Sequence, residues 1–143
     1  MRTSRDCEAT NQRCSMIERL KLANAPEPKG PFSPAVRVGD LLFVSGQGPI
    51  DPVTNKFVLG TIEEQTCLTI ENIRSILINC DSNLENVVKC SVFIVDPGDF
   101  AAMNRIYSEF FGANKPARTT IAAALVEPGM KVEIDCIAWS PTK

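Results

Sequence analysis

Arg118 is the first side chain whose surroundings point to chemistry. It stands at the start of a predicted strand, directly after a loop that contains Gly112 and Pro116. Functional residues gather where such loops meet strands, and a guanidinium there can hold a small carboxylate through two parallel hydrogen bonds. The alternative is a surface arginine paired with Asp or Glu, which composition alone favours.

Glu133 is the second candidate, because it shares an alternating segment with Asp135 while Val132 and Ile134 point the other way. In a strand, both carboxylates therefore lie on one face. If that face borders another subunit, partial desolvation raises the pKa of Glu133 and suits it to orient and deprotonate a water molecule. If the face is wet, both are ordinary solvated charges, and the sequence alone favours that outcome.

Two weaker signals precede these residues in the chain. Ser45 stands before Gly46, where a hydroxyl and free backbone donors could meet a ligand, although Ser-Gly is also a common way to leave a strand. Phe32 lies in the stiff segment 30–34, where its ring could be a pocket wall or a core anchor.

The composition excludes several kinds of catalytic and metal site. The 143-residue chain has no histidine, so the commonest general base and every Ser-His-Asp or Cys-His relay are excluded. Six cysteines form no C-x-x-C pair and no clustered metal spacing, which argues against zinc. We expect the four from residue 67 onward to be buried, reduced thiols of a cytoplasmic protein: Cys67, Cys80, Cys90 and Cys136.

The proportions of 44% hydrophobic and 22% charged residues are those of a soluble globular chain. A net charge of −2 and the lack of a basic stripe with interleaved aromatics make nucleic acid an unexpected partner. The longest apolar run, residues 121–126, is far too short to cross a bilayer. We expect residues 1–15 to form a flexible arm and residues 16–143 to form one domain.

The first elements that must position these side chains are a hairpin and a helix. Residues 35–38 and 41–45 flank Gly39 and Asp40, a spacing typical of a β-hairpin. The capping box formed by Thr61 and Glu64 predicts a helix over residues 61–80. Its predicted apolar stripe consists of Ile70, Ile73, Leu77 and Cys80.

A strand over residues 87–95 follows, with apolar residues on both sides: Val88, Cys90, Val92 and Ile94 on one, and Val87, Phe93 and Val95 on the other. Asp99 is the predicted cap of a second helix that Gly112 ends, with an apolar stripe of Phe100, Met103, Tyr107 and Phe110. Strands over 118–126 and 130–139 complete a ββαβαββ order and an α/β (α+β) fold.

Two helices that connect strands of one sheet can cover only one of its faces. The two-sided strand and the small residues Ala122, Ala123 and Ala124 suggest that the other face is packed as well. We therefore expect a homo-oligomer, because monomers seldom expose a large apolar patch. A monomer with a tolerably apolar outer face is the alternative.

From about Met16 to its end, the chain resembles the Rid family, the reactive intermediate deaminases also called the YjgF family. Five segments at consistent spacing carry the resemblance: GPFSPAVRVGDLLFVSGQGPIDP (30–52), IEEQTCLTIENI (62–73), DFAAMNRIYSEFF (99–111), PARTT (116–120) and VEID (132–135).

The resemblance implies a chorismate-mutase-like fold and a homotrimer whose inter-subunit clefts bind small 2-oxo or 2-imino acids without metal or organic cofactor. It implies that Arg118 grips the substrate carboxylate and that Glu133 positions the attacking water. Ser45, Asn104, Phe32 and Thr120 match other positions of the cleft. Two of these depart from the family pattern: Phe32 replaces a common tyrosine, and Thr120 replaces a common cysteine.

The predicted activity is therefore that of a 2-iminobutanoate/2-iminopropanoate deaminase, which releases ammonia and a 2-oxo acid. Removal of such imines would protect other enzymes from damage. The missing hydroxyl at Phe32 motivates an alternative, a non-catalytic protein that binds 2-oxo acids or regulates a partner. RNA cleavage has also been attributed to the family. We rank this activity below the other two because the sequence has no histidine and indicates no basic groove.

Overall fold

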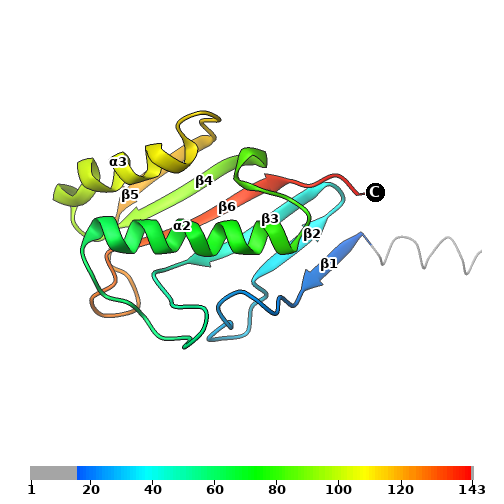
Figure 1. Cartoon of the computed structure of the whole chain (residues 1–143), viewed down its shortest axis with the longest axis horizontal. Coiled ribbons are helices and arrows are strands. Elements are labelled where there is room, and N and C mark those ends of the chain that lie inside the picture. The colour runs from blue at the N-terminus through cyan, green and yellow to red at the C-terminus, as the bar shows by residue number, and fades with distance from the viewer. Residues whose placement is uncertain (1–15, 143) are drawn as a thin grey trace, which may run out of the picture.

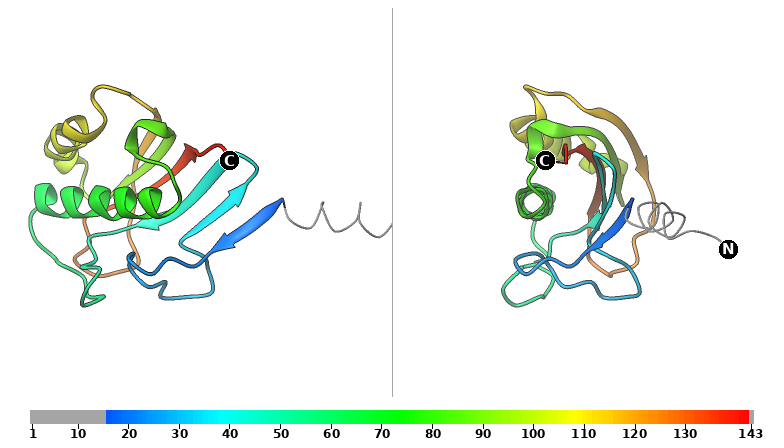
Figure 2. Two further views of the ribbon diagram at one scale, coloured as in Figure 1. Left: turned by 45° about the vertical axis from the view of Figure 1, so that its right-hand side comes forward. Right: turned by 90° about the vertical axis from the view of Figure 1, so that its right-hand side faces the viewer.

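The computed structural model describes residues 16–142, which form one twisted sheet with two helices on one face (Figure 1). The end-on view of Figure 2 shows both helices on the same side of the sheet. The elements are β1 (Ile17–Leu20), β2 (Ala35–Val38), β3 (Leu41–Gln47), α2 (Ile62–Asn79), η1 (Leu84–Asn86), β4 (Val87–Ile94), η2 (Pro97–Asp99), α3 (Phe100–Phe111), β5 (Ala117–Ala122) and β6 (Val132–Trp139).

The sheet has six strands in the order β1-β2-β3-β6-β4-β5. Neighbouring strands are antiparallel except β4 and β5, which run parallel because α3 connects them. The α/β fold class and the ββαβαββ order are confirmed from β2 onward. The sequence prediction missed β1, which is only four residues long and mostly exposed, so it shows little apolar alternation. The predicted arm, residues 1–15, lies outside the described residues.

The last two strands are shorter than predicted. Residues 123–131 form a loop between β5 and β6, with Gly129 at a φ of 84°. The apolar run that suggested a longer strand ends at Val126, whose side chain is 100% exposed. The predicted strand was therefore too long because it included apolar residues that have no neighbouring strand to pair with.

Helix α2 begins as the capping box predicts. The Thr61 hydroxyl accepts a hydrogen bond from the Glu64 amide at 3.2 Å, and the Glu64 carboxylate accepts one from the Thr61 amide at 2.7 Å. The predicted stripe on this helix is confirmed, because all four of its side chains are buried. Cys67 is the exception among the thiols: it is exposed on α2, so the prediction of four buried cysteines was wrong for this residue.

Helix α3 begins differently from the prediction. Asp99 forms no capping hydrogen bond, and its carboxylate instead lies 3.7 Å from the Lys131 ammonium. The cap belongs to Asp96, whose side chain accepts from the Gly98 amide at 2.8 Å and starts the short turn η2. The predicted apolar stripe is also only partly buried, because the helix turns Phe100 outward; its buried side chains are Met103, Ile106, Tyr107 and Phe111.

Strand β4 contains an irregularity that the sequence prediction missed. Its pairing with β6 shifts register between Val87 and Lys89. As a result Val87 is buried and Val88 is exposed, the reverse of the assignment expected from strict alternation. From Cys90 onward the alternation holds, and Cys90, Val92 and Ile94 face the helices.

The face of the sheet away from the helices carries large apolar side chains that are open to solvent in the single chain. Leu41, Phe43, Ile121 and Trp139 are exposed by 40–48%, and the strand registers place them on this one face. We call it the open face. No helix within residues 16–142 has the length and apolarity needed to cross a membrane.

The capping box generates a stability prediction. Replacing Thr61 by Ala removes the hydroxyl that satisfies the Glu64 amide, and should lower the free energy of unfolding by about 1 kcal/mol. Thr61→Ser keeps that hydroxyl and is the matched control. Urea denaturation of the three proteins measures the difference, and equal stabilities would show that the box contributes nothing.

Candidate functional site: two half-sites on opposite faces of the sheet

Arg118 lies near the start of β5 and points beneath helix α3. Its Cα is in register with Cys90, which faces the helices. Its Nη1 atom donates a hydrogen bond to Oδ1 of Asn104 at 2.8 Å. The guanidinium carbon is 4.7 Å from the ring centre of Tyr107 and 5.8 Å from that of Phe100. One helix therefore supplies every one of these contacts.

The charge of Arg118 is not neutralised by a neighbouring acid. Among residues 16–142, no carboxylate oxygen lies within 4.0 Å of its guanidinium. The arrangement thus differs from the salt-bridged surface arginine that composition favours. A cavity of about 300 Å³ opens beside it, lined by Asn104, Tyr107, Ser108, Phe111, Gly112, Lys115, Pro116 and Arg118. The site can accept a small anion.

Glu133 lies on β6 in register with Phe93, on the open face, as the alternation predicts. Burial raises the pKa of its carboxyl, and the negative charge of Asp135 raises it further. The carboxylate packs directly over Gly46 on β3, where any Cβ atom would collide with it. The missing side chain at Gly46 therefore makes room for Glu133.

Glu133 borders a second cavity, of about 330 Å³, with mainly apolar walls that include Phe32, Pro34, Ile50, Phe57 and Met130. The Lys29 ammonium lies 4.4 Å from the centre of the Phe57 ring at this cavity. Phe32 is 51% exposed. The sequence left two roles open for Phe32, a pocket wall or a core anchor. In the structure its ring forms a pocket wall.

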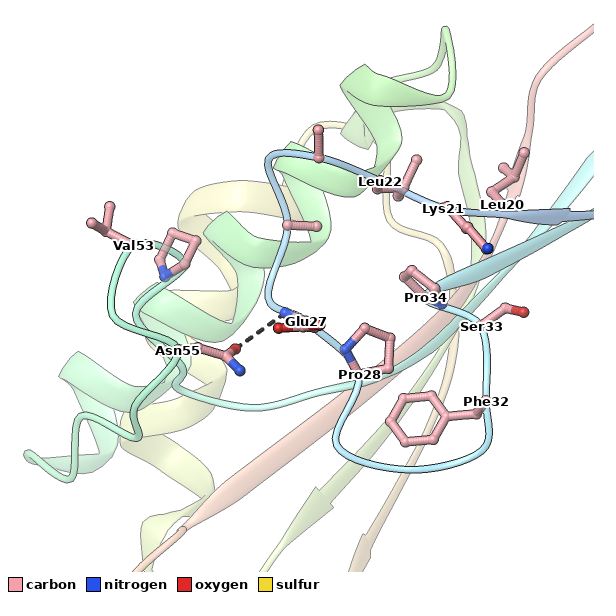
Figure 3. A pocket seen from close by; sticks show the side chains of 13 residues that line it. Leu20, Lys21, Leu22, Glu27, Pro28, Phe32, Ser33, Pro34, Val53 and Asn55 are labelled. Atoms are coloured by element: carbon pink, nitrogen blue, oxygen red, sulfur yellow. Dashed lines mark hydrogen bonds between the residues drawn. The ribbon is translucent and has the colours of Figure 1, made fainter.

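Phe32 also borders a third cavity, of about 640 Å³, shown in Figure 3. The figure shows its ring beside Pro28, on the loop that leads into β2. A hydrogen bond of 3.1 Å from the Glu27 amide to Oδ1 of Asn55 ties this loop to the one after β3. The Phe32 ring is therefore a shared wall between two cavities.

Ser45 and Thr120 occupy different surroundings from each other. The Ser45 hydroxyl donates to the Ser33 carbonyl at 2.6 Å, and its amide donates to the Pro34 carbonyl at 3.0 Å, so Ser45 fixes the segment that carries Phe32. Thr120 follows Arg118 on the helix-covered face, in register with Val92. Its hydroxyl oxygen is buried and has no hydrogen-bond partner within the part of the chain that is described.

The structure thus gathers the predicted residues into two groups. The Arg118 half-site contains Arg118, Asn104 and Thr120 on the helix-covered face, and the Glu133 half-site contains Glu133, Phe32 and Ser45 on the open side. Within one chain, Arg118 and Glu133 point to opposite sides of the sheet and line different cavities. The structure brings them together only if two chains meet.

Sequence reasoning missed three contacts that shape these half-sites. Phe100 and Tyr107 were assigned to an apolar core stripe, although both rings lie against Arg118. Their spacing of four and three residues from Asn104 places all three on one side of the helix, which is the signal that could have revealed them. The contact between Gly46 and Glu133 joins distant strands and has no local signal.

Comparison with known proteins agrees with this fold. The family model described as Endoribonuclease L-PSP matches residues 22–140. A RutC family protein of Pyrococcus abyssi is 46% identical over 115 residues, which cover 80% of this chain and 91% of that protein. Among solved structures, a Rid family protein of unknown function from Yersinia pestis, YyfA, is 33% identical with a TM-score of 0.81, covering 86% of this chain and 98% of its own.

A second solved structure is that of Escherichia coli TdcF with bound serine, which is 30% identical with a TM-score of 0.79 and covers 85% of this chain and 98% of its own. The extent of these matches shows that the chain belongs to the Rid family, also described as the L-PSP endoribonuclease family. The resemblance seen in the sequence is thereby confirmed.

The electrostatics of the Glu133 half-site generate a prediction about titration. Asp135→Asn removes a negative charge that disfavours ionisation of Glu133, so the pKa of Glu133 should fall toward its ordinary value. Carboxyl-detected NMR titration measures this shift directly. Glu109→Gln, a charge change on the exposed side of α3, is the control and should leave the Glu133 titration in place.

Proposed function

We propose that the protein is an imine deaminase that hydrolyses 2-iminobutanoate and 2-iminopropanoate to the corresponding 2-oxo acids and ammonia. The observation that carries the proposal is the Arg118 guanidinium, held in place by neutral groups and left free to bind a carboxylate. Membership of the Rid family is consistent with this activity.

The reaction needs little beyond orientation, because the imine carbon of a 2-imino acid is already electrophilic. Arg118 binds the substrate carboxylate through its forked N–H donors. Glu133 orients a water molecule, takes a proton from it as the oxygen attacks the imine carbon, and passes that proton to the nitrogen, so that the C=N double bond becomes a single bond. Glu133 then takes the second proton from the new hydroxyl group and passes it to the nitrogen as well, so that the C=O bond forms while the carbon–nitrogen bond breaks, and ammonia and the 2-oxo acid leave. The scheme uses no metal or organic cofactor.

We propose further that the working unit is a homotrimer, in which Arg118 of one chain meets Glu133 of its neighbour. Two features support this assembly. The half-sites lie on opposite faces of one sheet, so a single chain cannot complete the site. The open face also carries Phe43, Ile121 and Trp139, large apolar side chains that a second chain would cover.

A non-catalytic 2-oxo acid binding or regulatory protein is the second candidate function. Phe32 favours it, because its ring forms the cavity wall beside Glu133 without the hydroxyl that tyrosine would offer to a ligand or water. Tight binding of 2-oxobutanoate without any turnover of imine would choose this candidate. RNA cleavage stays third despite the family description, since the chain has a net charge of −2 and no histidine.

We also propose a small acid as the ligand and the cytoplasm as the location. The bound serine of TdcF is a small carboxylate-bearing molecule of the size that the Arg118 cavity could hold. The cysteines Cys80, Cys90 and Cys136 are free and buried, which suits a reducing compartment.

The central test uses a dehydratase that makes 2-iminobutanoate in the presence of a trapping amine such as semicarbazide. The wild-type protein should speed the formation of 2-oxobutanoate, and Arg118→Ala should abolish that acceleration, because the substrate carboxylate loses its partner. Arg105→Ala, at an exposed arginine of α3, is the matched control and should behave like the wild type. If Arg118→Ala accelerated the reaction as much as the wild type does, Arg118 would not be the group that binds the substrate carboxylate.

The same assay tests the composite site. Arg118→Ala and Glu133→Ala proteins, each inactive alone, should regain activity when they are unfolded together and refolded as a mixture. Random assembly would pair an intact Arg118 with a neighbour's intact Glu133 in about a quarter of the clefts. Mass spectrometry verifies that mixed trimers have formed. If these trimers regain no activity, Arg118 and Glu133 of neighbouring chains do not share a site, and the composite site is wrong.

Gly46→Ala gives a prediction for the placement of Glu133. The added Cβ would displace the carboxylate, and a misplacement of this kind can reduce the turnover number about 100-fold. In the double variant Gly46→Ala/Glu133→Ala, the glycine change should cost little more than Glu133→Ala alone, because both act on one group. Additive losses would contradict that interpretation.

A further inference from the structure

We propose that Phe100 and Tyr107 form an aromatic clamp that positions the Arg118 guanidinium for carboxylate binding while leaving its charge unneutralised. The inference rests on the proposed function, because it assigns Arg118 the substrate carboxylate. It adds two positioning residues that act through Arg118 and do not themselves touch the reacting atoms.

The geometry of α3 carries the proposal. Phe100, Asn104 and Tyr107 are four and three residues apart, so the helix presents them along one side. All three contact the same guanidinium: the amide oxygen at 2.8 Å, the Tyr107 ring centre at 4.7 Å and the Phe100 ring centre at 5.8 Å. Both ring distances fall within the range of cation–π attraction.

The two rings differ in burial, and the exposed one, Phe100, is not an ordinary core residue. Phe100 is 41% exposed, whereas Met103 and Phe111 on the same helix are almost fully buried. The Tyr107 ring is buried in the core, and its hydroxyl lies beside the Cys90 thiol. The feature that the two side chains share is an aromatic ring within cation–π distance of the Arg118 guanidinium.

The choice of neutral partners matters for the electrostatics of the site. An aspartate or glutamate beside Arg118 would fix the guanidinium as firmly, but would cancel the charge that attracts a substrate carboxylate. A ring face attracts the cation through its quadrupole and carries no net charge. The clamp therefore holds the fork of N–H donors in place without competing for it.

The test measures binding of 2-oxobutanoate by calorimetry and the steady-state kinetics of imine hydrolysis. Phe100→Leu and Tyr107→Leu should each weaken 2-oxobutanoate binding roughly tenfold, and should raise KM far more than they lower kcat. Tyr107→Phe keeps the ring and should stay within about twofold of the wild-type affinity. Because Phe100 is 41% exposed and lies outside the buried core, its variant should fold even if Tyr107→Leu does not.

A matched control lies on the same helix. Phe110 carries a comparable contact, with the Arg74 guanidinium carbon 5.1 Å from its ring centre, on residues that lie outside both half-sites. Phe110→Leu removes one aromatic–arginine contact of α3 without touching Arg118. Its affinity and KM should match those of the wild type, which separates loss of the clamp from general damage to the helix.

A ligand-free readout tests the clamp itself. The side-chain Nε–H resonance of Arg118, assigned through its loss in Arg118→Lys, should be shifted by the ring currents of the two aromatics and should move in Phe100→Leu and Tyr107→Leu. An unmoved resonance together with unchanged 2-oxobutanoate affinity would overturn the clamp. A different result would contradict the proposed function instead. If the wild-type protein does not bind 2-oxobutanoate but the Arg118 resonance moves in the two variants as expected, the proposed function is wrong and the positioning of Arg118 by the rings stands.

Discussion

The alternation of side chains along a strand is the constraint on which the rest of this structure depends. Consecutive residues of a strand point to opposite faces, and both helices of this chain cover the same face of the sheet. Arg118 therefore lies beneath α3, while Glu133 lies on the open face. Strand geometry separates the two groups that the proposed chemistry must unite, and this separation is the reason that the proposal includes a second copy of the chain.

Much of the fold could be predicted because its determinants are local. The capping box at Thr61, the stripe of α2 and the face of Glu133 each follow from residues within a few positions of one another. The predictions that were wrong involve partners from elsewhere in the chain. The register shift near Val88 depends on β6, and the Asp99 carboxylate faces Lys131 of a later loop instead of its own helix.

The candidate site shows the same division. Residue types and strand positions make Arg118 and Glu133 candidates, but the sequence alone favours a paired surface arginine and a solvated carboxylate, and their assigned roles came from the family resemblance. Their surroundings were only partly accessible from spacing. The spacing of Phe100, Asn104 and Tyr107 indicates one side of a helix, but not that this side lies against Arg118. The space that Gly46 leaves for Glu133 joins strands far apart in the sequence, and only the packed sheet brings them into contact.

Glu133 also illustrates a cost that function can impose on stability. Folding raises the pKa of this carboxyl above 4.5, so the folded chain binds its proton more tightly than the unfolded chain does. The contribution of the group to stability is therefore greatest below its unfolded pKa and is lost as pH rises through the folded pKa. Above the unfolded pKa, where the unfolded chain has released this proton, the cost of burying the carboxylate beside Asp135 opposes folding, and a glutamine would not carry that cost. In the proposed mechanism this cost is offset by the proton that Glu133 exchanges with water.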